Sequence, residues 1–146
     1  MKKILLILVA IFSVGIFSAQ ADNDKLIDKK QLPEAAQQFI DAHFAGIGIT
    51  YAKEEWHILF SSYEVKLADG TKIEFTNKGN WDEVDCRFGE VPAAIIPQPI
   101  KEYIKNNFAG EKVLYIEKDR NDYEVKLSNR LELKFDKNFN IYDIDD

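Results

Sequence analysis

The side chains best suited to catalysis are few in this sequence, and none of them lies in a recognisable catalytic motif. His43 and His57 are the only histidines, and Cys86 is the only cysteine. A histidine can transfer protons near neutral pH, and a cysteine thiolate can act as a nucleophile. His43 lies close to the apolar face of a predicted helix, and His57 has no Cys or Ser partner of the kind that nucleophilic catalysis requires. We interpret Cys86 as a small buried residue, because only Arg87 could supply the cation that a reactive thiol needs.

Carboxylates gather in two short segments of the chain. Such groups can hold calcium through oxygen ligands, or act as the acid and base of glycoside hydrolysis. Alternation along a strand sends neighbouring side chains to opposite faces, however, and neither group has the glycine-containing loop of an EF-hand. We favour solvated strand ends and predict no metal or cofactor site. The two groups are Asp82, Glu83 and Asp85, and Asp143, Asp145 and Asp146.

Four aromatic residues are better candidates, and the chemistry they indicate is binding. Tyr51 and Tyr115 occupy equivalent positions in two similar segments, Trp56 lies in an insertion, and Trp81 lies beside a turn. Aromatic anchors on a charged sheet surface are typical of protein-binding faces. The alternative is that all four pack in the core or against a connecting segment.

The elements that would position these residues are indicated by a strand that occurs twice. Residues 63–67 and 123–127 both read Tyr-Glu-Val-Lys-Leu. In an extended chain the Tyr, Val and Leu side chains share one face and the Glu and Lys side chains the other. Such a strand has one face in a core and one in water. The water-facing side chains would include Glu64, Lys66, Glu124 and Lys126.

Each copy of this strand lies in a run of four strands that follows one helix. Apolar residues at helical spacing predict helices over residues 33–44 and 97–108. Asp69-Gly70, between two alternating runs, is typical of a β-hairpin turn. The strands are predicted at residues 49–54, 60–67, 72–76 and 81–86, and again at 112–118, 122–128, 131–135 and 139–145.

This order of elements predicts an α+β fold, because runs of consecutive strands cannot be the βαβ units of a parallel sheet. We expect two tandem helix-plus-four-stranded antiparallel meander repeats, over about residues 31–86 and 91–146, joined in one sheet with both helices on one face. The position numbers of the two copies differ by 64 through the helix and by 60 through the later strands. The extra positions fall in the first copy, around Trp56. Residues 87–95 are predicted to form a packed connector with a helical turn.

The start of the chain, positions 1–21, has the features of a secretory signal peptide. Lys2 and Lys3 precede an apolar run, and small residues end the segment. We predict cleavage after Ala21 and a periplasmic or secreted domain of residues 22–146, with no membrane insertion after cleavage. With 25 acidic and 19 basic residues, the chain is a poor partner for nucleic acid or an anionic membrane. A single cysteine allows no internal disulfide, so the fold must depend on its hydrophobic core.

The sequence resembles the PepSY-like proteins of bacterial cell envelopes, which are also described as "putative β-lactamase-inhibitor-like" proteins. The resemblance covers essentially the whole mature chain and implies two helix-plus-four-strand repeats in one curved sheet, as in the β-lactamase inhibitor protein. It does not imply inhibition of a β-lactamase, because no inhibitory loop residue can be carried across. The second copy has Arg130 and Phe139 where the first has Gly70 and Gly79. The matching segments are Leu32-Pro33, Phe39-Ile40, Phe44, Tyr63-Glu64-Val65, Asp69-Gly70, Ile73-Glu74-Phe75, Gly79-Asn80-Trp81 and Val84-Asp85.

We therefore predict a non-enzymatic binding module that contacts an unidentified envelope protein or peptide, with inhibition as one possible consequence. It would use the open sheet face and the loop that contains Trp56. Two alternatives are a small hydrolase or metal-dependent enzyme that uses the acidic strand ends, and a structural or dimerising envelope protein. The candidate binding residues are Tyr51, Trp56, Trp81, Tyr115, Glu64, Lys66, Glu124 and Lys126.

Overall fold

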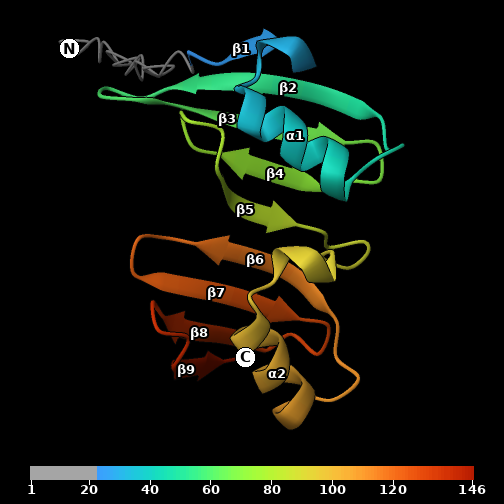
Figure 1. Cartoon of the computed structure of the whole chain (residues 1–146), viewed down its shortest axis with the longest axis vertical. Coiled ribbons are helices and arrows are strands. Elements are labelled where there is room, and N and C mark those ends of the chain that lie inside the picture. The colour runs from blue at the N-terminus through green and yellow to red at the C-terminus, as the bar shows by residue number, and fades with distance from the viewer. Residues whose placement is uncertain (1–22) are drawn as a thin grey trace, which may run out of the picture.

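Alternating apolar and charged residues build one antiparallel sheet, seen in a computed structural model that describes residues 23–146 (Figure 1). The sheet has nine strands in chain order, so β1 and β9 form its two edges. The predicted signal peptide, residues 1–21, lies outside the described residues. The strands are β1 (Lys25–Ile27), β2 (Ile49–Trp56), β3 (Ser61–Leu67), β4 (Lys72–Phe75), β5 (Trp81–Asp85), β6 (Val113–Lys118), β7 (Asp122–Leu127), β8 (Glu132–Asp136) and β9 (Ile141–Asp145).

Two α-helices, α1 (Glu34–His43) and α2 (Gln98–Asn107), cover the same face of the sheet (Figure 1). Phe39 of α1 meets Phe75 edge to face, with 5.7 Å between ring centroids. Tyr103 of α2 meets Phe135 in the same way at 5.4 Å. This packing confirms the α+β prediction. Short 3₁₀ turns precede the helices, η1 (Lys29–Gln31) and η2 (Ala93–Ile95), the second within the predicted connector.

The hydrophobic core lies between the helices and the sheet. Every second residue of the central strands points into it, as the alternating pattern predicts. Within residues 23–146, no helix has the length and apolar character needed to cross a bilayer. The fully buried side chains of the core include Val65, Ile73, Phe75, Val84, Ile100, Ile116, Val125, Leu133 and Phe135.

The sequence interpretation missed β1, since it assigned no strand before residue 49. Instead, Lys25, Leu26 and Ile27 pair antiparallel with Glu54, Lys53 and Ala52 of β2. A strand of three residues is too short for alternation to be recognised in a sequence. The sheet therefore has one more strand than the eight predicted.

Strict alternation along the strand predicted over residues 49–54 would place Ile49 on the same face as Tyr51, which is not the case. The register of β2 against β3 shifts between these two residues. The irregularity lets Ile49 pack against the core, while the Tyr51 side chain stays on the opposite face. β6 has a shift at the matching place, between Val113 and Tyr115.

Candidate functional site

A row of glutamates crosses the face of the sheet that lies opposite the helices, which we call the open face. The register places Glu64 opposite Glu74, Glu74 opposite Glu83, Glu83 opposite Glu117, and Glu117 opposite Glu124. Five neighbouring strands thus each contribute one glutamate to this glutamate row. Like charges directly opposite one another repel, so the row opposes folding unless cations lie beside it.

Lysines supply those cations on both sides of the row. In the first half, Lys72 Nζ lies 2.8 Å from a carboxylate oxygen of both Glu74 and Glu83. Burial opposes the charged form of Lys72, but its hydrogen bonds with the two glutamates raise its pKa overall. In the second half, Lys126 Nζ lies 3.3 Å from Glu124 and 3.5 Å from Glu132. The charges are therefore organised as a network rather than as isolated solvated groups.

Four predicted binding residues lie on the open face. Glu64, Glu124 and Lys126 belong to the network just described. Lys66 is opposite both Lys72 and Tyr51 in the register. The candidate residues on the repeated strands therefore share one surface.

Tyr51 and Tyr115 also lie on the open face, and each phenol donates a hydrogen bond to the glutamate row. Tyr51 Oη donates to Glu64 at 2.6 Å, which raises the pKa of Tyr51. Tyr115 Oη donates to Glu117 at 2.5 Å and lies 3.4 Å from Glu83. Burial and the Glu117 hydrogen bond raise the pKa of Tyr115. Both rings are therefore held in place by the acidic side chains that surround them.

Trp81 does not belong to this surface, although we had predicted it as a binding residue. Its partly buried ring packs on the helix-covered face, 6.2 Å from the ring of Phe39. Lys118 Nζ lies 4.2 Å from the centroid of the Trp81 ring, and burial lowers the pKa of Lys118. Trp81 is thus a packing residue beside α1, which proximity to a turn in the sequence did not reveal.

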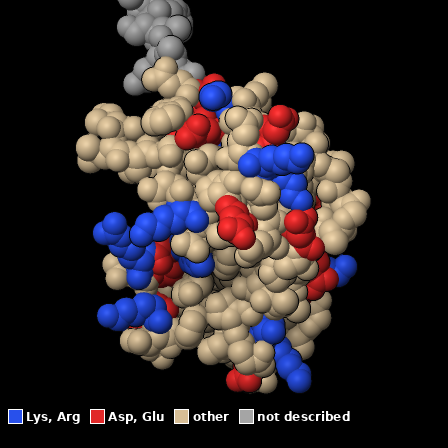
Figure 2. Space-filling model, turned by 45° about the horizontal axis from the view of Figure 1, so that its top comes forward, with Lys and Arg blue, Asp and Glu red and all other residues tan. Residues whose placement is uncertain are grey.

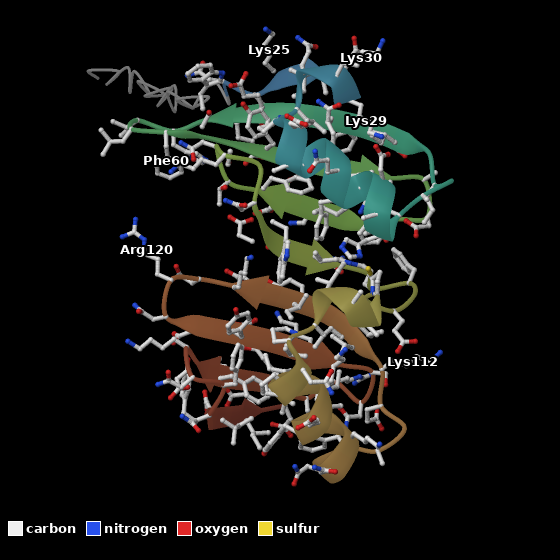
Figure 3. All side chains as sticks on the ribbon, viewed as in Figure 1. Lys25, Lys29, Lys30, Phe60, Lys112 and Arg120 are labelled. Atoms are coloured by element: carbon white, nitrogen blue, oxygen red, sulfur yellow. The ribbon has the colours of Figure 1, made fainter. Side chains whose placement is uncertain are left out.

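The hairpin tip, residues 56–60 between β2 and β3, is the most exposed apolar feature of the described chain. Ile58 is fully exposed and Leu59 is 91% exposed, while Trp56 and Phe60 are each more than half exposed. The His57 amide donates to the Phe60 carbonyl at 2.8 Å, and the two rings lie 4.8 Å apart. The tip is therefore an ordered turn, and its apolar side chains point outward (Figure 3, Phe60).

Sequence reasoning identified Trp56 in this segment but missed Ile58, Leu59 and Phe60. The available signal was a run of apolar residues where a hairpin turn is ordinarily polar. The counterpart turn between β6 and β7, residues 119–121, is Asp-Arg-Asn. The contrast between the apolar first turn and the polar second turn could have identified the exposed residues from the sequence.

Comparisons with known proteins agree with this architecture. The family description "Putative beta-lactamase-inhibitor-like, PepSY-like" matches residues 61–143. The chain belongs to this PepSY-like family. No curated protein matches the chain.

Three solved PepSY-like neighbours come from Bacteroides. A "putative calcium-regulated periplasmic protein" of Bacteroides thetaiotaomicron is 54% identical, with a TM-score of 0.82, and the match covers 84% of this chain and 97% of that one. A "putative periplasmic protein" of Bacteroides vulgatus is 48% identical, with a TM-score of 0.84 and coverage of 86% and 99%. A further one from that species, described as of unknown function, is 41% identical, with a TM-score of 0.80 and coverage of 84% and 99%.

The two histidines and the cysteine of this PepSY-like chain each contact residues of their own surroundings. His43 lies against Phe39, with 4.7 Å between ring centroids, and His57 Nε2 lies 3.1 Å from Ser62 Oγ. Cys86 is buried, and burial raises the pKa of its thiol. A buried thiol with a raised pKa is a poor nucleophile.

Three carboxylates of the acidic strand ends form ion pairs with neighbouring cations. Asp85 pairs with Arg87 at 2.5 Å, and Lys134 Nζ lies 3.1 Å from Asp143 and 3.3 Å from Asp145. Within residues 23–146, no group of three or more His, Cys, Asp or Glu side chains is arranged to hold a metal ion.

Asp82 stands out among the described carboxylates near the open face, because its pKa shifts strongly. It lies at the register irregularity between β4 and β5, and its buried Oδ1 has no hydrogen-bond partner within the described chain. Burial, followed by the charges of Glu74 and Glu83, raises the pKa of Asp82 from 3.8 to about 6. Compared with the unfolded chain, the folded protein therefore favours the protonated form of Asp82, and ionisation of this carboxyl lowers the free energy of unfolding.

We expect Asp82→Asn to stabilise the protein at pH 7. Between about pH 4 and pH 6 the folded wild type binds more protons at this site than the unfolded chain does, so its free energy of unfolding falls as pH rises. Since Asp82 is only about half buried, the loss is about 1–2 kcal/mol after allowance for solvent screening. Urea unfolding at pH 3.5 and pH 7 measures this loss. The free energy of unfolding of Asp82→Asn should exceed that of the wild type at pH 7 but not at pH 3.5. Glu102→Gln, at an exposed position of α2, is the control, and an equal gain at both pH values in Asp82→Asn would contradict the prediction.

Proposed function

We propose that this chain is a non-enzymatic periplasmic module that binds a folded envelope protein. Its main contact is the hairpin tip, residues 56–60, supported by the adjacent end of the open face. The observation that carries this proposal is the exposure of Trp56, Ile58, Leu59 and Phe60 on one ordered turn. Contiguous exposed apolar side chains of this kind mark interaction sites in soluble proteins.

The shape of the tip determines the kind of partner. The tip projects from the sheet as an uncharged extension, seen at the upper left of Figure 2. A projecting turn needs a concave partner, such as a cleft or pocket on a protein surface. Full burial of Ile58 and Leu59 would contribute about 1.5–3 kcal/mol each. Trp56 and Phe60 provide aromatic area of the kind that dominates many interfaces.

The open face would contribute specificity beside the tip. Glu55 and Ser62 pair directly behind it, and Lys53, Glu64 and Tyr51 follow along the same strands. These side chains already form hydrogen bonds and ion pairs with one another, so they are ordered before a partner arrives. Such charges mainly set the choice and orientation of a partner. The acidic excess of the open face favours a partner whose cleft has a basic rim.

We also infer that the chain consists of two repeats within a single domain. The α1 and α2 helices have ten residues each, and each helix precedes four strands of the sheet. Irregularities at β2 and β6 occupy equivalent positions. In this interpretation the apolar tip is a feature that only the first repeat acquired, which favours a specific role for it.

Location in the periplasm is part of the proposal. It is supported by the predicted signal peptide, with cleavage after Ala21, and by the two Bacteroides neighbours described as periplasmic. Calcium regulation, which the description of one neighbour includes, is not part of it. Asp85, Asp143 and Asp145 are already paired with Arg87 or Lys134, and no group of three or more His, Cys, Asp or Glu side chains among the described residues is arranged to hold a metal ion.

A double substitution in the tip tests the proposal. We expect Ile58→Ser with Leu59→Ser to abolish saturable capture of a periplasmic partner by the purified protein. Because both side chains are exposed, the free energy of unfolding should change by less than about 0.5 kcal/mol.

The matched control is Phe88→Ser, which removes another exposed apolar side chain, from the connector. It should leave capture intact. Undiminished capture by the tip variant, or equal loss in the control, would contradict the assignment of the tip as the main contact. Failure of the wild type to recover any saturable partner would count against the binding function itself.

A further inference from the structure

The two edges of the sheet differ in how they are covered. β1 covers the outer edge of β2, whereas β9 is the last strand and nothing in the described chain pairs with its outer side (Figure 1). Ile144 of β9 faces the core side of the sheet opposite Leu133, yet it remains 46% exposed. An uncovered edge strand offers a row of unpaired backbone groups to another strand.

The chain itself contains an example of the strand pairing that such an edge can make, at the place where the first repeat meets the second; we call this pairing the β5–β6 joint. β5 pairs antiparallel with β6, with Glu83 opposite Glu117, Val84 opposite Ile116 and Asp85 opposite Tyr115. Val84 and Ile116 are fully buried in this joint. Pairing with β6 therefore buries Val84, which would otherwise lie on an edge strand.

β9 is the sequence counterpart of β5. When 60 is added to the position number, Glu83, Val84 and Asp85 correspond to Asp143, Ile144 and Asp145. The strands also pair alike with their inner neighbours, since Val84 is opposite Ile73 and Ile144 is opposite Leu133. The outer edge of β9 thus resembles the edge of β5 that pairs with β6, but no strand of the described chain covers it.

β2 is the counterpart of β6, and its outer edge carries the short strand β1. When 64 is added to the position number, Tyr51, Ala52 and Lys53 correspond to Tyr115, Ile116 and Glu117. β1 contributes only three residue pairs to that edge, with Ile27 on the core side opposite Ala52. So short a strand is a weak cover for a strand of eight residues.

We propose that β9 of one copy of this chain pairs with β2 of a second copy in place of β1, in the register of the β5–β6 joint. The pairing is antiparallel and keeps the helices of both copies on the same face. It places Asp143 opposite Lys53, Ile144 opposite Ala52, and Asp145 opposite Tyr51. The inference rests on the correspondence of the two repeats and is independent of the hairpin tip.

Charge complementarity favours this occupant. The internal joint brings two acids together, Glu83 and Glu117, whereas the joint between copies brings Asp143 to Lys53. In the single copy, Lys53 Nζ binds Asp24, just before β1, at 3.0 Å. Asp143 would therefore replace the Asp24 carboxylate. A symmetric β9–β9 pair would instead bring the acidic C-terminal segments of two copies together, so repulsion opposes it.

The apolar contacts are replaced as well. Ile144 would take the position over Ala52 that Ile27 holds in the single copy, and would become as buried as Val84. β9 thus replaces both the Ile27 contact with Ala52 and the Asp24 ion pair with Lys53. Because the joint is head to tail, a pair of copies still has one unpaired β9 and one β2 without a partner copy, so association should continue beyond the dimer.

Disulfide trapping tests the register. Two full-length variants, each carrying Cys86→Ala, are mixed under mild oxidation: one has Asp143→Cys and the other Lys53→Cys. Directly opposed residues of an antiparallel pair lie at disulfide distance, so the mixed disulfide should form at least about tenfold more readily than with a Glu74→Cys partner. Glu74 lies on the same face but within the sheet. Equal trapping by both partners, or a predominant disulfide between two Asp143→Cys chains, would overturn the proposal.

Sedimentation at increasing concentration tests the exchange of strands. The average mass of the wild type should rise with concentration, and Ile144→Asp should remove the rise. Ile27→Asp weakens the packing of β1 beside β2, so the average mass of this variant should begin to rise at a lower concentration than that of the wild type. A concentration-independent monomer in both the wild type and Ile27→Asp would exclude the exchange. If Ile27→Asp does not fold, the trapping experiment still decides.

Discussion

Val65→Asp is expected to unfold the protein at room temperature. Val65 is fully buried in the middle of β3, between Ala52 of β2 and Ile73 of β4. A carboxylate there would be removed from water with no cation or hydrogen-bond donor beside it, which costs more than a typical core substitution. Folded domains are generally stabilised by only about 5–15 kcal/mol, so one such charge is expected to be enough to unfold this one.

Val125→Asp makes the same test in the second half. Val125 is also fully buried, between Ile116 and Leu133. If the sheet has one continuous core, both variants should lose the near-ultraviolet circular dichroism and the cooperative melt of the wild type together. Val65→Ala, which removes volume without adding a charge, should still melt cooperatively at a lower temperature. A cooperative melt retained by either Asp variant would show that the unsubstituted half folds independently.

The strands that contain these valines were predictable because their pattern is local. Alternation over residues 63–67 and 123–127 indicates which side chains are buried, and the structure buries Val65 and Val125 fully. β1 was not predictable, since its three residues acquire their role only from β2 beside them. The orientation of Ile49 was not predictable for a related reason, because no residue type marks the irregularity that turns it toward the core.

The open face shows the same division. The sequence indicated that Tyr51 and Tyr115 are equivalent and left open whether they are surface anchors or core residues, and the structure places both on the open face. The glutamate row could not be predicted from the sequence, because it depends on the register of five strands at once. Trp81 was misjudged because its contact with Phe39 joins an element far from it in the sequence. The local pattern thus predicts which side chains share a face of a strand. The neighbours of those side chains depend on strand register and tertiary packing.

The turns after β4 and β8 lead to the second large prediction. Gly79 has φ +84°, and its counterpart Phe139 has φ +65°. Phe139 holds this left-handed conformation while its ring packs 5.2 Å from that of Tyr123. A non-glycine residue is therefore tolerated at this turn in the second half. The glycine in the first half must have a further reason.

That reason is the closeness of α1. A Cβ added to Gly79 would lie 2.7 Å from Pro33 Cβ and 3.0 Å from the backbone nitrogen of Ala36. Both atoms belong to the rigid start of the helix, so neither can move aside cheaply. We expect Gly79→Ala to lower the free energy of unfolding by about 2–5 kcal/mol, combining the left-handed conformation with overpacking against the helix.

Gly46→Ala separates the two contributions. Gly46 has φ +80°, and a Cβ added there would meet nothing within 4 Å. It should lose only the conformational part, about 1–2 kcal/mol. Urea unfolding of both variants gives the difference directly, and that difference measures how tightly the turn after β4 fits against α1. Equal losses at the two positions would mean that α1 yields to the added methyl group, and the close fit would then have no part in fixing the helix on the sheet.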